Sequence, residues 1–225
     1  GFAPDRDIYI AFGFDEESMG TLGAKNIAET LEKRGVRLEF VLDEGGLFID
    51  GAEMGVRAML ATIGVCEKGY TDLKLTAESA GGHASRPPKQ TAVGALSKAI
   101  VALEKRQMKP KMNDVLLSML DRVGGYMRFP LNVICANLFI TKPLLLKALT
   151  AKPSGAAMVR TTTAPTMLKG SSAPNVLAEK AEANINFRIS PSDDLDKLLK
   201  HVKRTVGSGI EVEVVIPPHP PRVSG

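Results

Sequence analysis

The sequence predicts an α/β protein: a strand–helix–strand segment near the N-terminus, then a ferredoxin-like α+β sandwich that carries a helical insertion. Three observations predict this class. Apolar residues switch between a period of two and a period of 3.6 along the chain. The later elements follow the order β-α-β-β-α-β. The 225 residues, 44% hydrophobic and 24% charged, have the composition of a folded chain with one or two domains.

The N-terminal part is predicted as a parallel strand–helix–strand unit. Residues 8–12 form an apolar run that ends at Gly13, as a buried strand does. A helix with an apolar stripe is predicted from about Thr21, and Gly35 is placed to end it. Residues 36–42 form a second β-rich run. This order predicts a right-handed βαβ unit, with acidic residues just beyond the strand ends, where open α/β sheets keep their active sites.

The second part begins near Tyr70. Residues 73–77 and 181–189 alternate apolar and polar side chains, which indicates strands with one buried face. Apolar residues within 93–103 recur at steps of three and four, which predicts an amphipathic helix. A further strand is expected within residues 156–168.

A helix and a strand complete the predicted sandwich. Ser190 is placed to cap the helix, with Pro191 in its first turn, and Gly207 is placed to end it. Residues 210–214 then alternate as a last strand. Residues 108–152 fall outside the β-α-β-β-α-β order, and we expect them to form an extra, mainly helical insertion.

Charge and cysteine content exclude several classes of protein. The net charge of +4 comes without a block of like charges, so we expect no nucleic-acid partner. Cys66 and Cys135 are too few for a disulfide scaffold, which suits a reducing, cytoplasmic location. The apolar stretch 129–149 is interrupted by Pro130 and Lys142, so we expect no membrane span and interpret it as a buried helix or a partner-facing surface.

Two acidic turns follow the predicted strands. Adjacent carboxylates at Asp15, Glu16 and Glu17 repel one another, so they favour a bound cation, or else they cap the next helix and face water. Asp43 and Glu44 precede two glycines, a pattern that alone is typical of a turn. In a βαβ unit both turns fall at one edge of the sheet, where their carboxylates could share a metal ion.

A histidine loop is the third candidate. Two glycines precede His83 and two prolines follow it within residues 81–88, so a stiff loop could present a ring N–H to an oxyanion. The alternative is a purely structural histidine. His201 lies on a basic helix end and His219 in a proline-rich tail, and both are weaker candidates.

These runs, in this order, resemble the zinc metallopeptidase family that includes carboxypeptidase S, aminoacylase and succinyl-diaminopimelate desuccinylase. The resemblance is closest to its carboxypeptidase S-like branch, which includes N-fatty-acyl amino acid synthase/hydrolases. The motifs that carry it lie at residues 11–17, 41–46, 81–88, 129–132, 160–163, 175–177 and 186–188.

The resemblance implies a two-zinc site. Glu16 would be the general base that takes a proton from water, and Glu17 would be a zinc ligand. A further ligand would come from Asp43 or Glu44. Phe14 replaces a histidine that is not a metal ligand in the family, so this change bears on local polarity. The family's His-x-Asp motif, whose Asp bridges the two metals, is absent from this sequence, and so is the segment with the last zinc-binding histidine. We therefore expect a fragment of a longer enzyme that binds zinc weakly or not at all and is inactive by itself.

The resemblance also implies a substrate and a partner. His83 would reach across a homodimer, paired through the lid domain, to steady the oxyanion in the partner's active site. Asn175 and Arg188 would hold the substrate's carboxylate or oxyanion. The parent enzyme would hydrolyse a dipeptide or N-acyl amino acid at an amide bond next to a free carboxylate. The alternative is a non-catalytic dimerisation or interaction module that keeps the fold.

The resemblance divides the chain into three segments. Residues 1–68 would be part of an α/β zinc-peptidase catalytic domain. Residues 69–217 would be the lid or dimerisation domain, with the helical insertion at 108–152, and residues 218–225 would be a tail.

Overall fold

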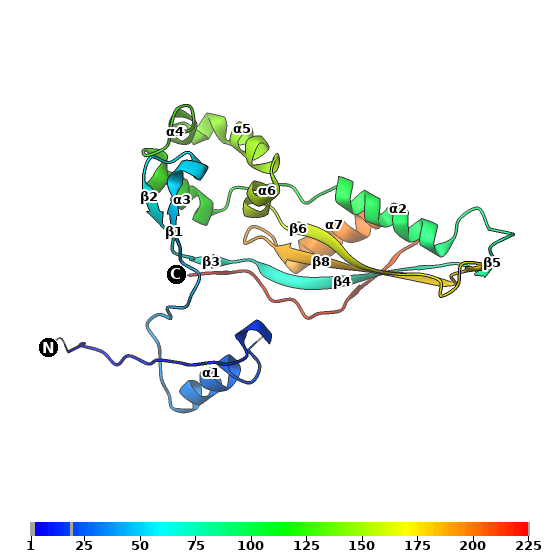
Figure 1. Cartoon of the computed structure of the whole chain (residues 1–225), viewed down its shortest axis with the longest axis horizontal. Coiled ribbons are helices and arrows are strands. Elements are labelled where there is room, and N and C mark those ends of the chain that lie inside the picture. The colour runs from blue at the N-terminus through cyan, green and yellow to red at the C-terminus, as the bar shows by residue number, and fades with distance from the viewer. Residues whose placement is uncertain (1–2, 19, 225) are drawn as a thin grey trace. The chain divides into compact units, whose positions relative to one another are not determined.

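Four antiparallel strands in the order β6-β8-β4-β9 form the main sheet of the computed structural model, which describes residues 3–18 and 20–224 (Figure 1). Helices α2 and α7 pack on one face of this sheet. The chain order is β-α-β-β-α-β, which confirms the predicted ferredoxin-like sandwich. The elements are β4 (Gly69–Glu78), α2 (Ala92–Lys105), β6 (Thr162–Lys169), β8 (Lys180–Ile189), α7 (Leu195–Val206) and β9 (Glu211–Val214).

The two faces of the sheet have opposite chemistry because side chains alternate along each strand. Leu73, Leu75, Ile185 and Phe187 face the helices and are completely buried. Leu198 of α7 is buried in the same core. The other face carries polar side chains. Burial of the apolar face on two amphipathic helices is what stabilises this layer.

The start of α7 differs from the prediction. The prediction that Ser190 caps this helix was wrong, because Asp194 is the cap and accepts a hydrogen bond from the Lys197 backbone N–H at 2.8 Å. Ser190 is buried, and its own N–H donates to Thr161 Oγ1 at 3.0 Å. The cap of α7 therefore lies four residues further along the chain than predicted.

The insertion is helical, as predicted, and forms a second hydrophobic core. It consists of α3 (Asp114–Gly124), α4 (Leu131–Ala136), α5 (Leu138–Thr150) and α6 (Pro153–Val159), so it extends past residue 152. Val56 packs into this core from the hairpin of β1 (Phe48–Asp50), the 3-10 turn η2 (Gly51–Met54) and β2 (Met59–Ala61). Two short pairs complete this part: β3 (Cys66–Glu67) with β10 (Arg222–Val223), and β5 (Gly82–His83) with β7 (Val176–Leu177).

The chain divides into two compact units, Gly1–Gly45 and Gly46–Gly225. The first unit contains the 3-10 turn η1 (Glu16–Ser18) and α1 (Ala24–Lys33), which confirms the predicted helix. The predicted strands at 8–12 and 36–42 were wrong: among the described residues of this unit no strand is formed, and Phe12 is 87% exposed. A parallel strand needs a neighbouring strand as hydrogen-bond partner, and neither segment has one here. The assignment of residues 1–68 to a catalytic domain stays a prediction.

No helix within the described residues is long and apolar enough to cross a membrane.

The buried face of the sandwich gives a stability prediction. Replacing Phe187 by alanine leaves a cavity in the core, so we expect a loss of about 3–5 kcal/mol in the free energy of unfolding. Phe139→Ala removes the same atoms from a side chain that is 83% exposed, and we expect a change within about 0.5 kcal/mol. Urea denaturation of both variants measures this, and equal losses would contradict the assigned core.

Candidate functional site

The three carboxylates of the first acidic turn, residues 15–17, have different surroundings: one accepts backbone hydrogen bonds and two are exposed. The Asp15 carboxylate accepts hydrogen bonds from the backbone N–H groups of Leu22 and Gly23, both at 2.7 Å, at the start of α1. A Cβ placed on Gly23 would lie 2.5 Å from Asp15 Oδ1, so a side chain at this position would displace the Asp15 carboxylate. Glu16 and Glu17 lie on η1 and are exposed. Asp15 therefore holds the turn that precedes α1 and that carries Glu16 and Glu17, without bonding the N–H groups of the helix itself.

The second acidic turn does not complete a metal site with the first. Asp43 and Glu44 are exposed, and Asp43 Oδ1 accepts the backbone N–H of Glu44 at 2.9 Å. Within residues 3–18 and 20–224, no three Asp, Glu, His or Cys side chains gather as metal ligands. Zinc takes about four ligands, so Glu17 with Asp43 or Glu44 does not fit a whole zinc site. Their convergence on one cation stays a prediction.

The His83 loop is held by a short two-stranded pair. In this pair His83 lies opposite Val176, and the Ala84 N–H donates to the Asn175 carbonyl at 2.9 Å. Gly82 in the same turn has a φ of +120°, a conformation that favours glycine. The structure therefore brings His83 and Asn175 together, and both are exposed.

The hydrogen bonds of His83 determine which ring nitrogen carries the proton. The Ser85 backbone N–H lies 3.2 Å from His83 Nδ1, and Ser85 Oγ lies 2.8 Å from the same atom. Because a backbone N–H only donates, Nδ1 accepts, and the proton of the neutral ring resides on Nε2. His83 Nε2–H is thus an exposed donor of the kind that stabilises an oxyanion.

Arg188 lies on the polar face of the sheet, as predicted from the alternation of β8. Its guanidinium carbon is 4.8 Å from the centroid of the Tyr70 ring, a cation–π contact. Asp72 lies next on the same face of β4 and accepts hydrogen bonds from Asn184 Nδ2 at 3.0 Å and Asn186 Nδ2 at 2.7 Å. Burial and the nearby Asp72 carboxylate raise the pKa of the Tyr70 phenol. The Asp72 hydrogen bonds thus lie beside the Tyr70 ring, over which the Arg188 guanidinium is placed.

The surroundings of Arg188 are basic. Lys68 Nζ donates to the carbonyls of Ala157 at 3.0 Å and Arg160 at 2.8 Å, at the end of α6. Burial, followed by the charge of Arg188, lowers the pKa of the Lys68 amine. Two neighbouring cations repel each other, so an anionic group beside Arg188 would be stabilised electrostatically.

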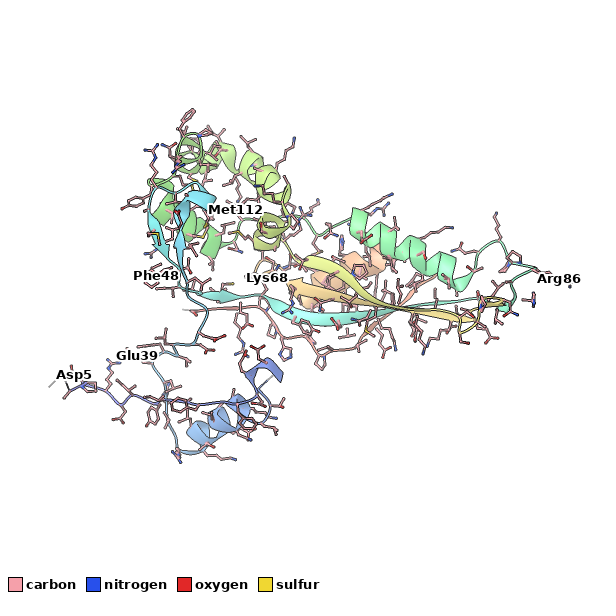
Figure 2. The ribbon with its side chains drawn as sticks, in the orientation of Figure 1. Asp5, Glu39, Phe48, Lys68, Arg86 and Met112 are labelled. Atoms are coloured by element: carbon pink, nitrogen blue, oxygen red, sulfur yellow. The ribbon has the colours of Figure 1, made fainter. Side chains whose placement is uncertain are left out.

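The strand register separates Arg188 from the His83 loop. Arg188 lies opposite Tyr70, whereas Lys180, at the other end of β8, lies opposite Glu78. The eight residue steps from Lys180 to Arg188 span roughly 26 Å of strand. Figure 2 shows Lys68 at one end of the sheet and Arg86 beyond the other. The structure therefore does not bring Arg188 together with His83 and Asn175.

The other two histidines have structural contacts. His201 Nε2 lies 2.7 Å from the Arg106 carbonyl and ties α7 to the end of α2. His219 pairs through its backbone with Tyr70 beside the sheet. The His201 ring and the His219 backbone therefore make contacts within the second unit.

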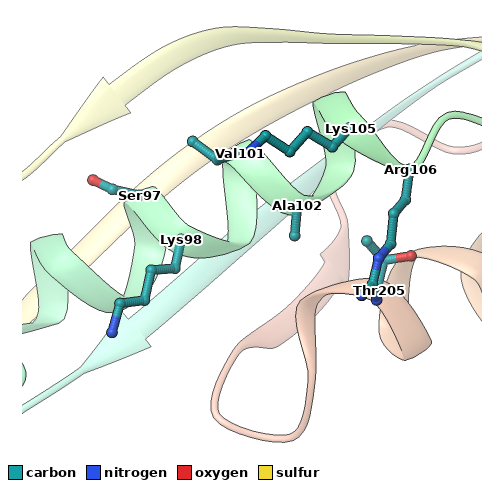
Figure 3. A pocket seen from close by; sticks show the side chains of 7 residues that line it. All are labelled: Ser97, Lys98, Val101, Ala102, Lys105, Arg106 and Thr205. Atoms are coloured by element: carbon teal, nitrogen blue, oxygen red, sulfur yellow. The ribbon is translucent and has the colours of Figure 1, made fainter.

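A shallow hollow of about 500 Å³ lies between α2 and the end of α7 (Figure 3). Its lining includes Lys98, Lys105 and Arg106, with Thr205 from α7. It lies among the helices, which cover the face of the sheet opposite Arg188. None of its lining residues is acidic or a histidine, so it is not the acid–base site.

Comparison with known proteins identifies the family. The peptidase dimerisation domain of the M20 family matches residues 65–211. The chain belongs to the M20 peptidase family. The matched residues contain the sandwich up to the first residue of β9, together with the helical insertion.

The relatives are hydrolases of the branch that the motifs indicate. An N-fatty-acyl-amino acid synthase/hydrolase of Xenopus tropicalis is 40% identical over 208 residues, covering 92% of this chain and 40% of that protein. A probable carboxypeptidase S-like protein of Dictyostelium discoideum is 36% identical, with the same coverage. The chain thus spans about 40% of the length of these relatives. Human carnosine dipeptidase 1 shares the fold over 93% of this chain and 47% of its own, with a TM-score of 0.51 and 8% identity.

The tautomer of His83 is directly measurable. We expect ¹⁵N NMR of the neutral ring to show the proton on Nε2, because the Ser85 N–H occupies Nδ1. Ser85→Ala removes the hydroxyl and keeps the backbone N–H, so this variant should keep the Nε2–H form. A proton on Nδ1 in either protein would contradict the oxyanion-donor geometry.

Proposed function

We propose that the whole protein is a zinc-dependent M20 hydrolase that cleaves an amide bond next to a free carboxylate, in a dipeptide or an N-acyl amino acid. The observation that carries this proposal is the His83 loop, which presents an exposed Nε2–H donor on a stiff, paired turn. The hydrolase names of the relatives support the reaction class. Glu17 with Asp43 or Glu44 would supply carboxylates to a two-zinc site that these residues do not complete.

Residues of this chain would carry out proton transfer and would bind both the oxyanion and the carboxylate of the substrate. Glu16, on the turn held by Asp15, would take a proton from the attacking water and return it to the leaving amine. The His83 Nε2–H would donate to the oxyanion of the tetrahedral intermediate. Arg188, supported by Tyr70, would bind the substrate carboxylate, because its guanidinium matches a carboxylate with two parallel hydrogen bonds.

One active site would use residues from two copies of the chain. The tetrahedral carbon and the free carboxylate of such a substrate are only a few bonds apart, whereas His83 and Arg188 of one chain lie at opposite ends of the sheet. A homodimer paired through the lid domain would place His83 and Asn175 of one copy beside Arg188 of the other. The matched peptidase dimerisation domain supports this arrangement.

The 225-residue chain alone is proposed to be inactive, since its acidic turns lack a full set of zinc ligands. The alternative function is a non-catalytic dimerisation or interaction module. Assay of the whole protein with zinc, on a panel of N-acyl amino acids and dipeptides, separates the two functions. Absence of turnover on every substrate, in a folded protein that holds zinc, would support the module.

Mixed dimers give the decisive test of the shared site. We expect Glu16→Ala and His83→Ala each to lower kcat of the whole protein by about 100-fold or more, because each removes a group that acts in the transition state. When the two variants are mixed as random dimers, half are heterodimers with one intact site, so activity should return to about a quarter of the unsubstituted level. No recovery would show that both residues act within one copy, and unchanged turnover of Glu16→Ala would exclude it as the base.

A further inference from the structure

The part of the helical insertion from residue 122 to residue 159 has an unusual distribution of charge, whereas the earlier part of α3 contains Asp114 and Asp121. Of the chain's 29 Lys and Arg residues, five lie in residues 122–159, and all 25 Asp and Glu residues lie outside this segment. All five side chains are exposed, and within the part of the chain that the structure describes none forms an ion pair. They are Arg122, Arg128, Lys142, Lys147 and Lys152. This segment therefore carries net positive charge, while Asp121 directly precedes Arg122 and Asp50 lines a hollow together with Arg128.

The same segment exposes large apolar side chains. Phe139, Phe129 and Ile140 are 83%, 77% and 69% exposed, and Tyr126 and Leu144 are about three-fifths exposed. Isolated exposed apolar residues are ordinary, but a group of aromatic and branched side chains in one segment indicates an interaction surface. We call these five apolar residues and the five basic residues the insertion face.

Helix α5 shows how the two kinds of side chain combine. Leu145 points into the insertion core and is 7% exposed. Ile140, Leu144 and Lys147 follow one another at steps of four and three, so they share a side of the helix, and all three are exposed. The exposed side of α5 thus combines two apolar side chains, Ile140 and Leu144, with the basic Lys147. Its 13 residues, about 20 Å long, are too short to span a bilayer.

We propose that the insertion face docks on the surface of an anionic phospholipid membrane. Aromatic and branched side chains enter the boundary between headgroups and acyl chains, and surrounding lysines and arginines contact lipid phosphates. The charge of the segment complements this surface, since it has five cations and no carboxylate to repel the lipid. The inference uses no residue of the proposed catalytic machinery and does not depend on the proposed function.

Sedimentation of the 225-residue chain with vesicles tests this surface. We expect binding to phosphatidylcholine vesicles that contain about 30% phosphatidylserine, weaker binding to phosphatidylcholine alone, and a loss of affinity as salt is raised. Lys142→Gln with Lys147→Gln should lower the partition coefficient about thirty-fold, at about one kcal/mol for each lysine near the lipid. Phe139→Ser with Ile140→Ser should lower it at least about tenfold. All four positions are exposed, so these variants should keep the far-ultraviolet circular dichroism of the parent chain.

Two matched controls distinguish the insertion face from general adsorption. Ile10→Ser with Phe12→Ser changes equally exposed apolar residues of the first unit, and Lys98→Gln with Lys105→Gln changes two lysines on α2. Unchanged binding of both controls supports the proposal. Equal sedimentation with neutral and anionic vesicles, no sedimentation with either, or an equal loss in the controls would overturn it.

Discussion

The antiparallel register between β4 and β8 determines where the chemistry of this chain can lie. Ten residue pairs, from Gly69 with Ile189 to Glu78 with Lys180, hold the two central strands in one alignment. A shift by a single residue would turn Phe187 out of the core and Arg188 into it. The buried apolar face therefore specifies the register, and the register then places Arg188 over Tyr70 and the His83 loop beyond the far end of the sheet.

The separation of Arg188 from the His83 loop limits which residues of one copy could act on the same substrate. Within one copy, the sheet keeps His83, which would donate to the oxyanion, away from Arg188, which would bind the same substrate's carboxylate. A single copy would then hold two halves of different sites. Pairing through the lid would complete both sites at once, which gives a physical reason for a dimerisation domain to carry substrate-binding residues.

Sequence periodicity correctly predicted the strands and helices that bury their apolar side chains against one another within the sandwich. The alternation around Phe187 and Leu73 predicted β8 and β4, because one face of each strand must be buried wherever the sheet packs. The strands at 8–12 and 36–42 were not formed, because a parallel strand depends on a distant partner that local periodicity does not specify. Ser190 has the chemistry of a cap, but Asp194 has it too, and the helix begins after Asp194. The alternation of side chains in β4 could have indicated that Tyr70 and Asp72 share the polar face of the sheet. It could not have indicated that Tyr70 lies opposite Arg188, because that contact depends on how β4 pairs with β8.

The central claim is the separation of His83 from Arg188 within one chain, and a spin-label distance measures it directly. Both positions are exposed, so cysteines introduced there in a chain with Cys66 and Cys135 replaced by serine accept labels with little disturbance of the core. Diluting the labelled chain with unlabelled chain removes distances between copies. We expect a separation above roughly 26 Å, because the label at 83 lies beyond the strand end. A distance below roughly 15 Å would contradict the register and the shared site that depends on it.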